Sequence, residues 1–336
     1  MLDQLQRAQE ISAAGLAALP DGTSCTPLVL RGAVADWPFV REARRSDEAA
    51  VEYLGRFYNG QPVSTLVAAP SERGRFFYRA DSNRMNFETA SAMLPDVLKA
   101  LLDERNSKDP AAIAMQAVSA PDCLPGLEVE NPNPFVPAGS RARVWIGNAL
   151  TVAPHFDVSE NIACVVAGRR RFILFPPEQT PNLYPGPMDI TPASVPISMV
   201  VMDNSELDRF PKYREALAGA FVADLEPGDA IYIPYLWWHG VQSLGGFNVL
   251  VNYWFNRDEA AARYPLVPML HLAFRAYRDM APEHREAWRA LYDHYVFQID
   301  GDPMEPLTPV HREAPAPTSA EEIARLRQVL RELLGS

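Results

Sequence analysis

A histidine and an aspartate two positions apart, His155 and Asp157, have the types and spacing for metal chemistry. Alternate side chains of an extended strand share a face, so both can point into one cavity while Phe156 turns the other way. His239 lies in a second apolar, aromatic-rich stretch, 82 residues after Asp157. Two imidazoles and one carboxylate are the facial triad of non-haem iron(II) centres. We therefore predict a metal centre of His155, Asp157 and His239.

The ordinary interpretation of a histidine near an aspartate is a hydrogen-bonded pair with no metal, because short motifs match by chance. The surroundings favour the metal. Both histidines lie in strongly apolar strand patterns, where a polar group is costly unless it is paired or bound to an ion. The two segments are far apart along the chain, so only a folded sheet can bring the three side chains together.

Short apolar runs separated by turns predict the strands that position these residues. They fall at 27–30, 62–68, 76–78, 144–147, 152–155, 161–167, 171–175, 221–225, 230–233, 239–243 and 247–255. Residues 111–118 fit a strand or a helix equally well by period alone. A proline-rich insertion at 176–219 is too long for a hairpin loop. The pattern predicts a mainly β fold with flanking helices, a double-stranded β-helix or jelly roll.

Helical spacing of apolar residues flanks the strands. It predicts helices at 2–19, 49–57, 94–104, 258–281 and 282–297. A proline-rich linker at 300–317 precedes a last amphipathic helix, which begins at a capping box at Ser319. We divide the chain into a β-rich domain at 1–256, a C-terminal helical pair at 257–300, and the linker with its terminal helix at 301–336.

Composition excludes several classes of protein. A net charge of -11 argues against binding along a nucleic-acid backbone, which needs clustered basic side chains. The three cysteines, Cys25, Cys123 and Cys164, show no spacing typical of a zinc site or a disulfide framework. No apolar run reaches the length of a membrane span. We expect a cytoplasmic protein that binds neither nucleic acid nor membrane.

Ordered motifs across residues 143–255 resemble the cupin-like branch of the JmjC-domain oxygenases, including an asparaginyl hydroxylase of that branch. They are WIG at 145–147, His155 with Asp157, Asn161, Gly168 with its basic run, FILFPP at 172–177, NLYP at 182–185, ELDRFP at 206–211, EPGD at 226–229, YIP at 232–234, WWH at 237–239 and VNYW at 251–254. The resemblance implies a dioxygenase that uses Fe(II), 2-oxoglutarate as cosubstrate and O2 to hydroxylate a C–H bond. It also implies that His155, Asp157 and His239 bind the iron.

The same resemblance places a basic side chain at Arg170, where the family binds the far carboxylate of 2-oxoglutarate. An arginine suits this role because its planar fork matches a carboxylate. Strand alternation predicts that Arg169 and Arg171 share the opposite face. An inward Arg170 favours a 2-oxo acid as ligand, whereas an Arg170 facing solvent favours other metal-binding cupins.

Further family positions near the metal and the cosubstrate are Asn161 and Asn252, and Trp254 should share the face of Asn252. The chain departs from the family at two positions. Val152 stands where a hydroxyl side chain is usual, with Thr151 one place earlier, and Ala114 stands where a related hydroxylase has a tyrosine. We predict Thr151 as a cosubstrate contact in place of the usual hydroxyl.

The resemblance implies a peptide or small-molecule substrate, hydroxylated either at a protein side chain or in a small amino-acid-like compound. Tyr78, Gln116 and Trp238 are the candidate substrate contacts. The resemblance also implies a homodimer formed through the C-terminal helical pair. Two other functions stay open: a non-catalytic metal-binding cupin that senses or carries a small ligand, and a metal-dependent isomerase or ring-cleaving cupin, whose sites commonly contain more histidines.

Overall fold

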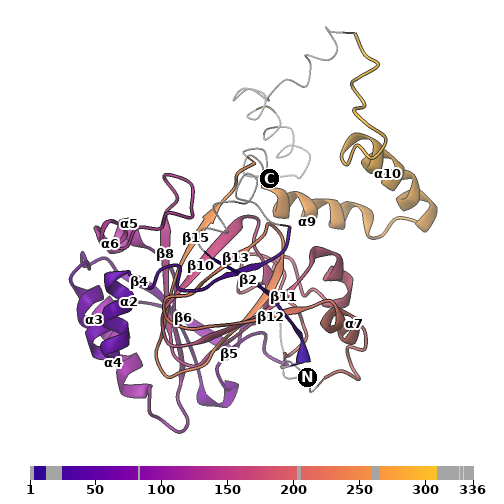
Figure 1. Ribbon diagram of the computed structural model, residues 1–336. Coiled ribbons are helices and arrows are strands. Elements are labelled where there is room, and N and C mark those ends of the chain that lie inside the picture. The colour runs from indigo at the N-terminus through magenta and orange to yellow at the C-terminus, as the bar shows by residue number, and fades with distance from the viewer. Residues whose placement is uncertain are drawn as a thin grey trace. The chain divides into compact units, whose positions relative to one another are not determined.

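A computed structural model describes residues 4–12, 25–81, 84–202, 206–258 and 265–308, together with Arg325 and Gln328. The chain forms two compact units, residues 1–268 and 269–336. The first unit is built on two β-sheets with helices against them (Figure 1). This architecture confirms the predicted mainly β jelly roll.

The smaller sheet has six strands, and it carries two of the predicted metal ligands on neighbouring strands. Its order is β1 (Gln6–Arg7), β12 (Phe221–Leu225), β11 (Arg170–Phe175), β14 (Trp238–Ser243), β9 (Thr151–Phe156) and β5 (Arg75–Phe76). Strands β11, β14 and β9 pair antiparallel, although they come from distant parts of the chain.

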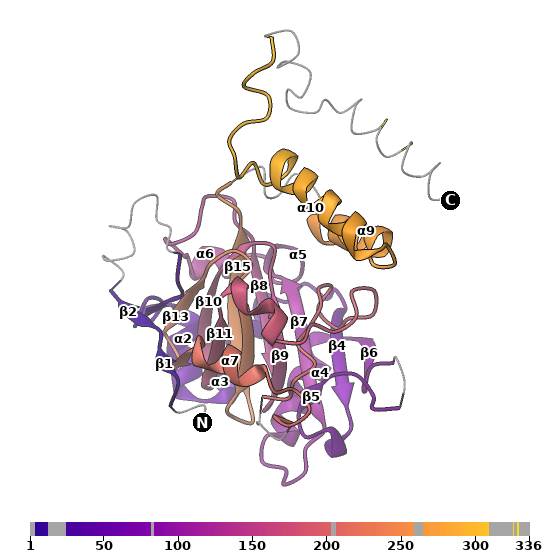
Figure 2. The same ribbon diagram turned by 90° about the vertical axis from the view of Figure 1, so that its right-hand side faces the viewer.

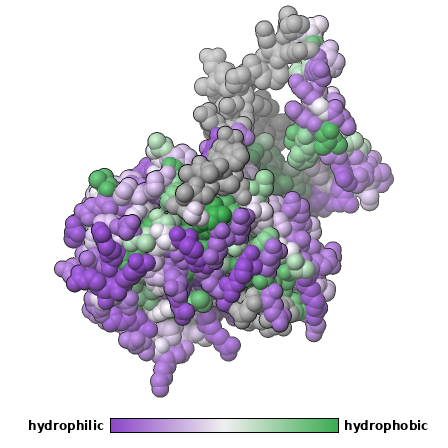
Figure 3. Space-filling model, in the orientation of Figure 1, coloured by the Kyte–Doolittle hydropathy of each residue, from purple (hydrophilic) through white to green (hydrophobic). Residues whose placement is uncertain are grey.

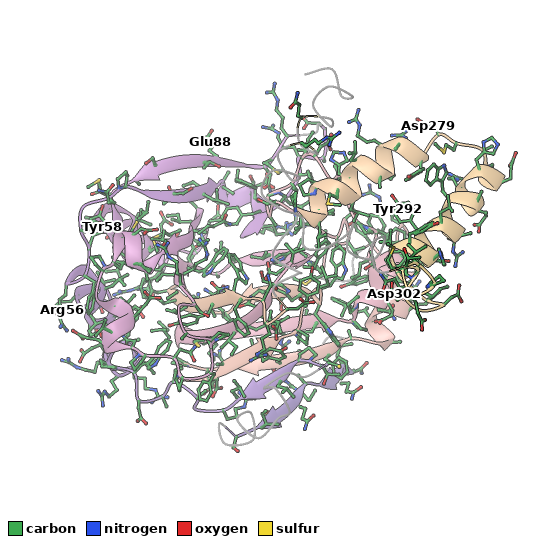
Figure 4. The ribbon with its side chains drawn as sticks, turned by 90° about the horizontal axis from the view of Figure 1, so that it is seen from above. Arg56, Tyr58, Glu88, Asp279, Tyr292 and Asp302 are labelled. Carbon is green, nitrogen blue, oxygen red and sulfur yellow. The ribbon has the colours of Figure 1, made fainter. Side chains whose placement is uncertain are left out.

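The larger sheet has nine strands. Its order is β2 (Gln9–Ile11), β3 (Leu28–Leu30), β13 (Ala230–Ile233), β10 (Glu160–Ala167), β15 (Asn248–Phe255), β8 (Ala142–Gly147), β7 (Ala112–Ser119), β4 (Val63–Ala68) and β6 (Phe87–Ala92). Every residue of the central strand β10 is buried, which explains the unbroken apolar run at 162–167. The edge strand β6 is mostly exposed, and Glu88 projects from it in Figure 4.

Helices cover the outer face of the larger sheet (Figures 1 and 2). They are α2 (Pro38–Arg45), α3 (Asp47–Gly55), α4 (Leu94–Glu104), α5 (Ala120–Cys123) and α6 (Leu127–Glu130), with the short turn η3 (Pro70–Glu72) elsewhere in the unit. Their apolar side chains, among them Phe39, Leu54 and Leu101, form one core cluster with strand residues such as Val144 and Ile162. A second cluster fills the space between the sheets, and it includes Val165 and Phe172.

The described parts of the insertion, residues 176–202 and 206–219, pack on the outer face of the smaller sheet. It contains η4 (Pro177–Asn182) and α7 (Tyr213–Ala218), the latter visible in front of the sheet in Figure 2. Side chains of the insertion form a third cluster with Ile173, Phe175 and Trp238. The described residues of the insertion therefore cover the outer face of the strands that carry the metal ligands.

The N-terminal prediction of a helix at 2–19 is wrong for the described residues 4–12. Strand β1 pairs parallel with β12, and β2 pairs parallel with β3. Hydrogen bonding at two sheet edges has overridden the helical spacing. The segment 111–118, which fits both states, lies almost entirely in strand β7, because β4 and β8 pair with this strand on either side.

The second unit contains most of α9 (Leu266–Tyr277) and all of α10 (Pro282–Tyr295), the predicted helical pair. Tyr277 packs edge-to-face against Tyr292, which Figure 4 labels, and also contacts Trp288. The predicted terminal helix lies outside the described residues, apart from Arg325 and Gln328, which are helical. Among the helices of the described residues, none has the length and apolar character needed to span a membrane.

Candidate metal centre

The two histidines meet because β9 and β14 are neighbours. His155 and His239 stand opposite each other in the antiparallel register, and their ring centroids are 4.4 Å apart. Asp157 follows directly after β9. One potential metal-ligand atom from each of the three residues lies within 4.8 Å of the corresponding atoms of the other two. Among the described residues, this is the one such group of three or more histidine, cysteine or acidic side chains.

Backbone carbonyls set the tautomer of both imidazoles. His155 Nδ1 lies 3.0 Å from the Ala153 oxygen, and His239 Nδ1 lies 3.0 Å from the Trp237 oxygen. A carbonyl only accepts, so each Nδ1 donates and each Nε2 keeps its lone pair for a metal. Burial, together with the neighbouring His239, lowers the pKa of His155 to about 4. This imidazole is therefore neutral at pH 7, the state in which it binds a metal.

Two donors hold the carboxylate of Asp157. Asn161 Nδ2 donates to Asp157 Oδ2 at 3.2 Å, and Trp254 Nε1 donates to the same oxygen at 2.8 Å. His239 Nε2 lies 3.6 Å from it. Two imidazoles and one oriented carboxylate suit a divalent ion such as Fe(II), and they leave open coordination positions for ligands.

A chain of hydrogen bonds leads from Trp145 to Asp157. Trp145 Nε1 donates to Asn252 Oδ1 at 2.7 Å, and Asn252 Nδ2 donates to Asn161 Oδ1 at 3.1 Å. An indole only donates and an ionised carboxylate only accepts, so the two ends fix the orientation of both amides between them. We call Trp145, Asn252, Asn161 and Asp157 the amide relay. It joins β8, β15 and β10 to the metal centre.

We predict that Trp145→Phe lowers the affinity for metal about 10- to 100-fold, the usual cost of losing an outer-shell partner of a metal ligand. Phenylalanine keeps an aromatic ring against Trp254, whose centroid lies 5.9 Å away, but it removes the N–H that orients Asn252. Competition with a fluorescent chelator measures the affinity. Trp288→Phe, in the second unit, is the matched control, and equal affinities for both variants would contradict a role for the relay.

The three ligands open into a cavity of about 160 Å³ between the sheets. Most of its wall is apolar, with Phe76, Leu150, Phe172, Val241 and Leu250 among the contributors. Its polar members are Gln116, Asn161, Arg170, Ser243 and Asn252, in addition to the metal ligands and the indoles of Trp145 and Trp254. A mostly apolar cavity with a few convergent polar groups is typical of a small-molecule site.

Arg170 lies in this cavity and is only 8% exposed. Its Nε has no hydrogen-bond partner among the described residues, and burial lowers the pKa of its guanidinium to about 10. The neighbouring arginines face away, as alternation predicts. Arg169 is exposed, and Arg171 Nε donates to Asp224 at 2.6 Å. A buried guanidinium without a partner among the described residues is stabilised by an anion that pairs with it.

A bulge decides which residue of β9 faces the cavity. The register between β14 and β9 shifts between His239 and Val241. As a result Val152 lines the cavity, and Thr151 does not. The structure therefore does not bring Thr151 together with the other predicted cosubstrate contacts. Ala114 lines the cavity without any hydroxyl to offer.

The three candidate substrate contacts have different positions. Gln116 lines the cavity, next to Ala117, which has a strained φ of 46° at a register shift in β7. The Tyr78 hydroxyl instead donates to the Ile190 oxygen at 2.8 Å. Trp238 packs on the outer face of its strand, and its Nε1 donates to Thr180 Oγ1 at 2.9 Å. The structure does not bring Tyr78 and Trp238 to the metal ligands.

Sequence reasoning missed two polar members of the site, the indole N–H of Trp145 and the hydroxyl of Ser243. Strand alternation could have placed both side chains on a cavity-facing side. Ser243 lies an even number of positions after His239, and Gly147 and Trp145 share a face of β8. Their roles depend on cross-strand partners, which the period of one strand does not specify.

A family model described as a cupin-like domain matches residues 23–261. The human protein named HSPB1-associated protein 1 is 34% identical over 155 residues, which are 45% of this chain and 31% of that protein. This chain thus matches less than a third of the length of that relative.

Two other relatives carry names of enzymes. The Arabidopsis thaliana protein named lysine-specific demethylase JMJ31 is 31% identical over 159 residues, which are 47% of this chain and 27% of that protein. The human protein named bifunctional peptidase and (3S)-lysyl hydroxylase JMJD7 is 25% identical over 266 residues, which are 69% of this chain and 78% of that protein.

Proposed function

This chain belongs to the cupin-like domain family, and from that premise we propose that it is an Fe(II)- and 2-oxoglutarate-dependent dioxygenase that hydroxylates its substrate. One observation carries the proposal: the three-ligand centre lines the same cavity as Arg170, whose Nε has no partner among the described residues. A 2-oxo dicarboxylate fits both, because its oxo-acid end can bind a metal while its far carboxylate pairs with the guanidinium.

His155, Asp157 and His239 would hold the iron, which when loaded with 2-oxoglutarate and O2 supplies the oxidising power for C–H hydroxylation. The protein's own groups have separate tasks. The backbone carbonyls of Ala153 and Trp237 orient the imidazoles, and the amide relay with Trp254 orients the carboxylate. The apolar wall keeps bulk water from the reacting groups.

The substrate that we propose is a protein side chain presented on a peptide. The names of JMJD7 and JMJ31 each contain a lysine-directed activity, and HSPB1-associated protein 1 is named for a protein partner. Gln116 has an amide at the cavity wall with which to contact a peptide. A free amino-acid-like substrate is the competing proposal, and the likeness to an asparaginyl hydroxylase also stays a prediction.

The test is succinate formation from 2-oxoglutarate by the purified protein with Fe(II) and O2, with and without a peptide library. We expect slow succinate release without peptide, and faster release with a peptide that gains one oxygen atom by mass spectrometry. Iron and 2-oxoglutarate that bind without any turnover would support the sensor or carrier instead. A protein that binds no iron would contradict both functions.

We also propose that the chain forms a homodimer through its C-terminal helices. Large apolar side chains are exposed in the second unit, where hydrophobic residues gather in Figure 3. They include Met269, Leu270, Phe274, Leu291 and Tyr295, and such clustering is typical of an interface. We expect light scattering to give a dimer mass for the wild type and a monomer mass for Leu270→Glu. A wild-type monomer at micromolar concentration would contradict the proposal.

A further inference from the structure

Ser243, at the end of β14, is a second polar side chain of the cavity that has no hydrogen-bond partner in the part of the chain that the structure describes. It is 8% exposed, and it lines the same cavity as the metal ligands. Its backbone N–H donates to the Leu150 oxygen, but no group of the described residues hydrogen-bonds to its hydroxyl. The hydroxyl of this largely buried residue can therefore bond to a ligand that enters the cavity.

The register places this hydroxyl beside Arg170. Residues Arg170 and Ser243 stand directly opposite each other where β11 pairs with β14. Side chains at opposite positions share a face, with Cβ atoms about 5 Å apart. Four positions separate Ser243 from the metal ligand His239 on the same strand, which corresponds to about 13 Å. The Arg170–Ser243 pair is therefore separated from the metal ligands, as the group that binds the far end of an extended ligand would be.

The other polar groups of the cavity are already engaged or lie elsewhere. Trp145, Asn252 and Asn161 bond to one another, and Trp254 bonds to Asp157. Gln116 belongs to β7, in the other sheet. The usual hydroxyl and tyrosine positions hold Val152 and Ala114, which offer nothing to a carboxylate. Ser243 is thus the cavity hydroxyl that adjoins the guanidinium.

We propose that Ser243 and Arg170 together bind the far carboxylate of a 2-oxo dicarboxylic acid, with Ser243 replacing the donors that Val152 and Ala114 lack. The inference rests on the proposed function, since it assumes an oxo acid at the metal. The guanidinium supplies two parallel N–H donors and the hydroxyl supplies a third donor from the neighbouring strand. A carboxylate so held is selected over an alkyl group at that end of the ligand.

The experiment is calorimetric titration of Fe(II)-loaded protein, without oxygen, by two ligands. They are 2-oxoglutarate and 2-oxopentanoate, in which a methyl group replaces the far carboxylate. We expect Ser243→Ala to weaken 2-oxoglutarate binding about tenfold or more, which is 1.4 kcal/mol, and to leave 2-oxopentanoate binding unchanged. Ser243→Thr, which keeps a hydroxyl, should retain most of the affinity. Ser64→Ala, at an exposed position on β4, is the matched control.

Three outcomes overturn the inference. If Ser243→Ala binds 2-oxoglutarate as tightly as the wild type, Ser243 does not contribute to the carboxylate site. If Ser243→Ala loses the same affinity for both ligands, the role of Ser243 is structural. Weaker 2-oxoglutarate binding in Thr151→Ala, with unchanged binding in Ser243→Ala, would show that Thr151 contacts the far carboxylate, as the sequence predicted. A wild-type protein that binds iron but neither ligand would instead contradict the proposed function itself.

Discussion

Asp157→Ala should lower the affinity for Fe(II) more than about 100-fold and abolish succinate formation. Outer-shell changes already cost 10- to 100-fold at metal sites, and this change removes a ligand. It also leaves Asn161 Nδ2 and Trp254 Nε1 without their common acceptor. His155→Ala should behave in the same way, because it removes the imidazole that faces His239. Chelator competition measures the metal, and chromatography measures succinate.

Matched controls separate this effect from misfolding. Asp208→Ala and His284→Ala make the same substitutions at exposed positions, and both should keep metal binding and turnover at wild-type levels. Circular dichroism should show that Asp157→Ala retains the β-rich fold. An Asp157→Ala protein that is folded and still forms succinate would rule out the proposed centre.

Arg170→Met should have opposite effects on stability and on cosubstrate binding. The guanidinium is buried, and its Nε has no partner in the described part of the chain, so the ligand-free protein bears its desolvation cost. An apolar side chain of similar length removes that cost, and we expect the free energy of unfolding to rise by about 1 to 4 kcal/mol. Affinity for 2-oxoglutarate should fall about 30-fold or more, because a buried charge pair is lost.

Denaturant titration without ligand and calorimetry with 2-oxoglutarate measure the two effects. Arg169→Met, one position earlier and exposed, is the control and should change neither quantity appreciably. A destabilised Arg170→Met protein with unchanged affinity would show that the guanidinium has a structural partner. Such a result would favour the isomerase or sensor over the oxygenase.

Much of this protein can be predicted from local pattern alone. Alternation over a few residues is enough to place His155 and Asp157 on one face, to turn Arg170 away from Arg169 and Arg171, and to locate most of the strands of the two sheets, although β1, β2 and β6 were not predicted. Each of these properties depends on the period of a single segment, and a segment carries that period in its own residues. The jelly roll follows from the number and spacing of such segments.

Contacts between distant segments decided the rest. Residues 4–12 have helical spacing, but 6–7 and 9–11 form strands because they pair with the edges of β12 and β3. A bulge opposite β14 turned Val152 inward in place of Thr151, since one extra residue exchanges the two faces of a strand. The amide relay and the pairing of Ser243 with Arg170 likewise depend on cross-strand register. Register is fixed by the partner strand as well as by the segment, so only the tertiary structure determines it.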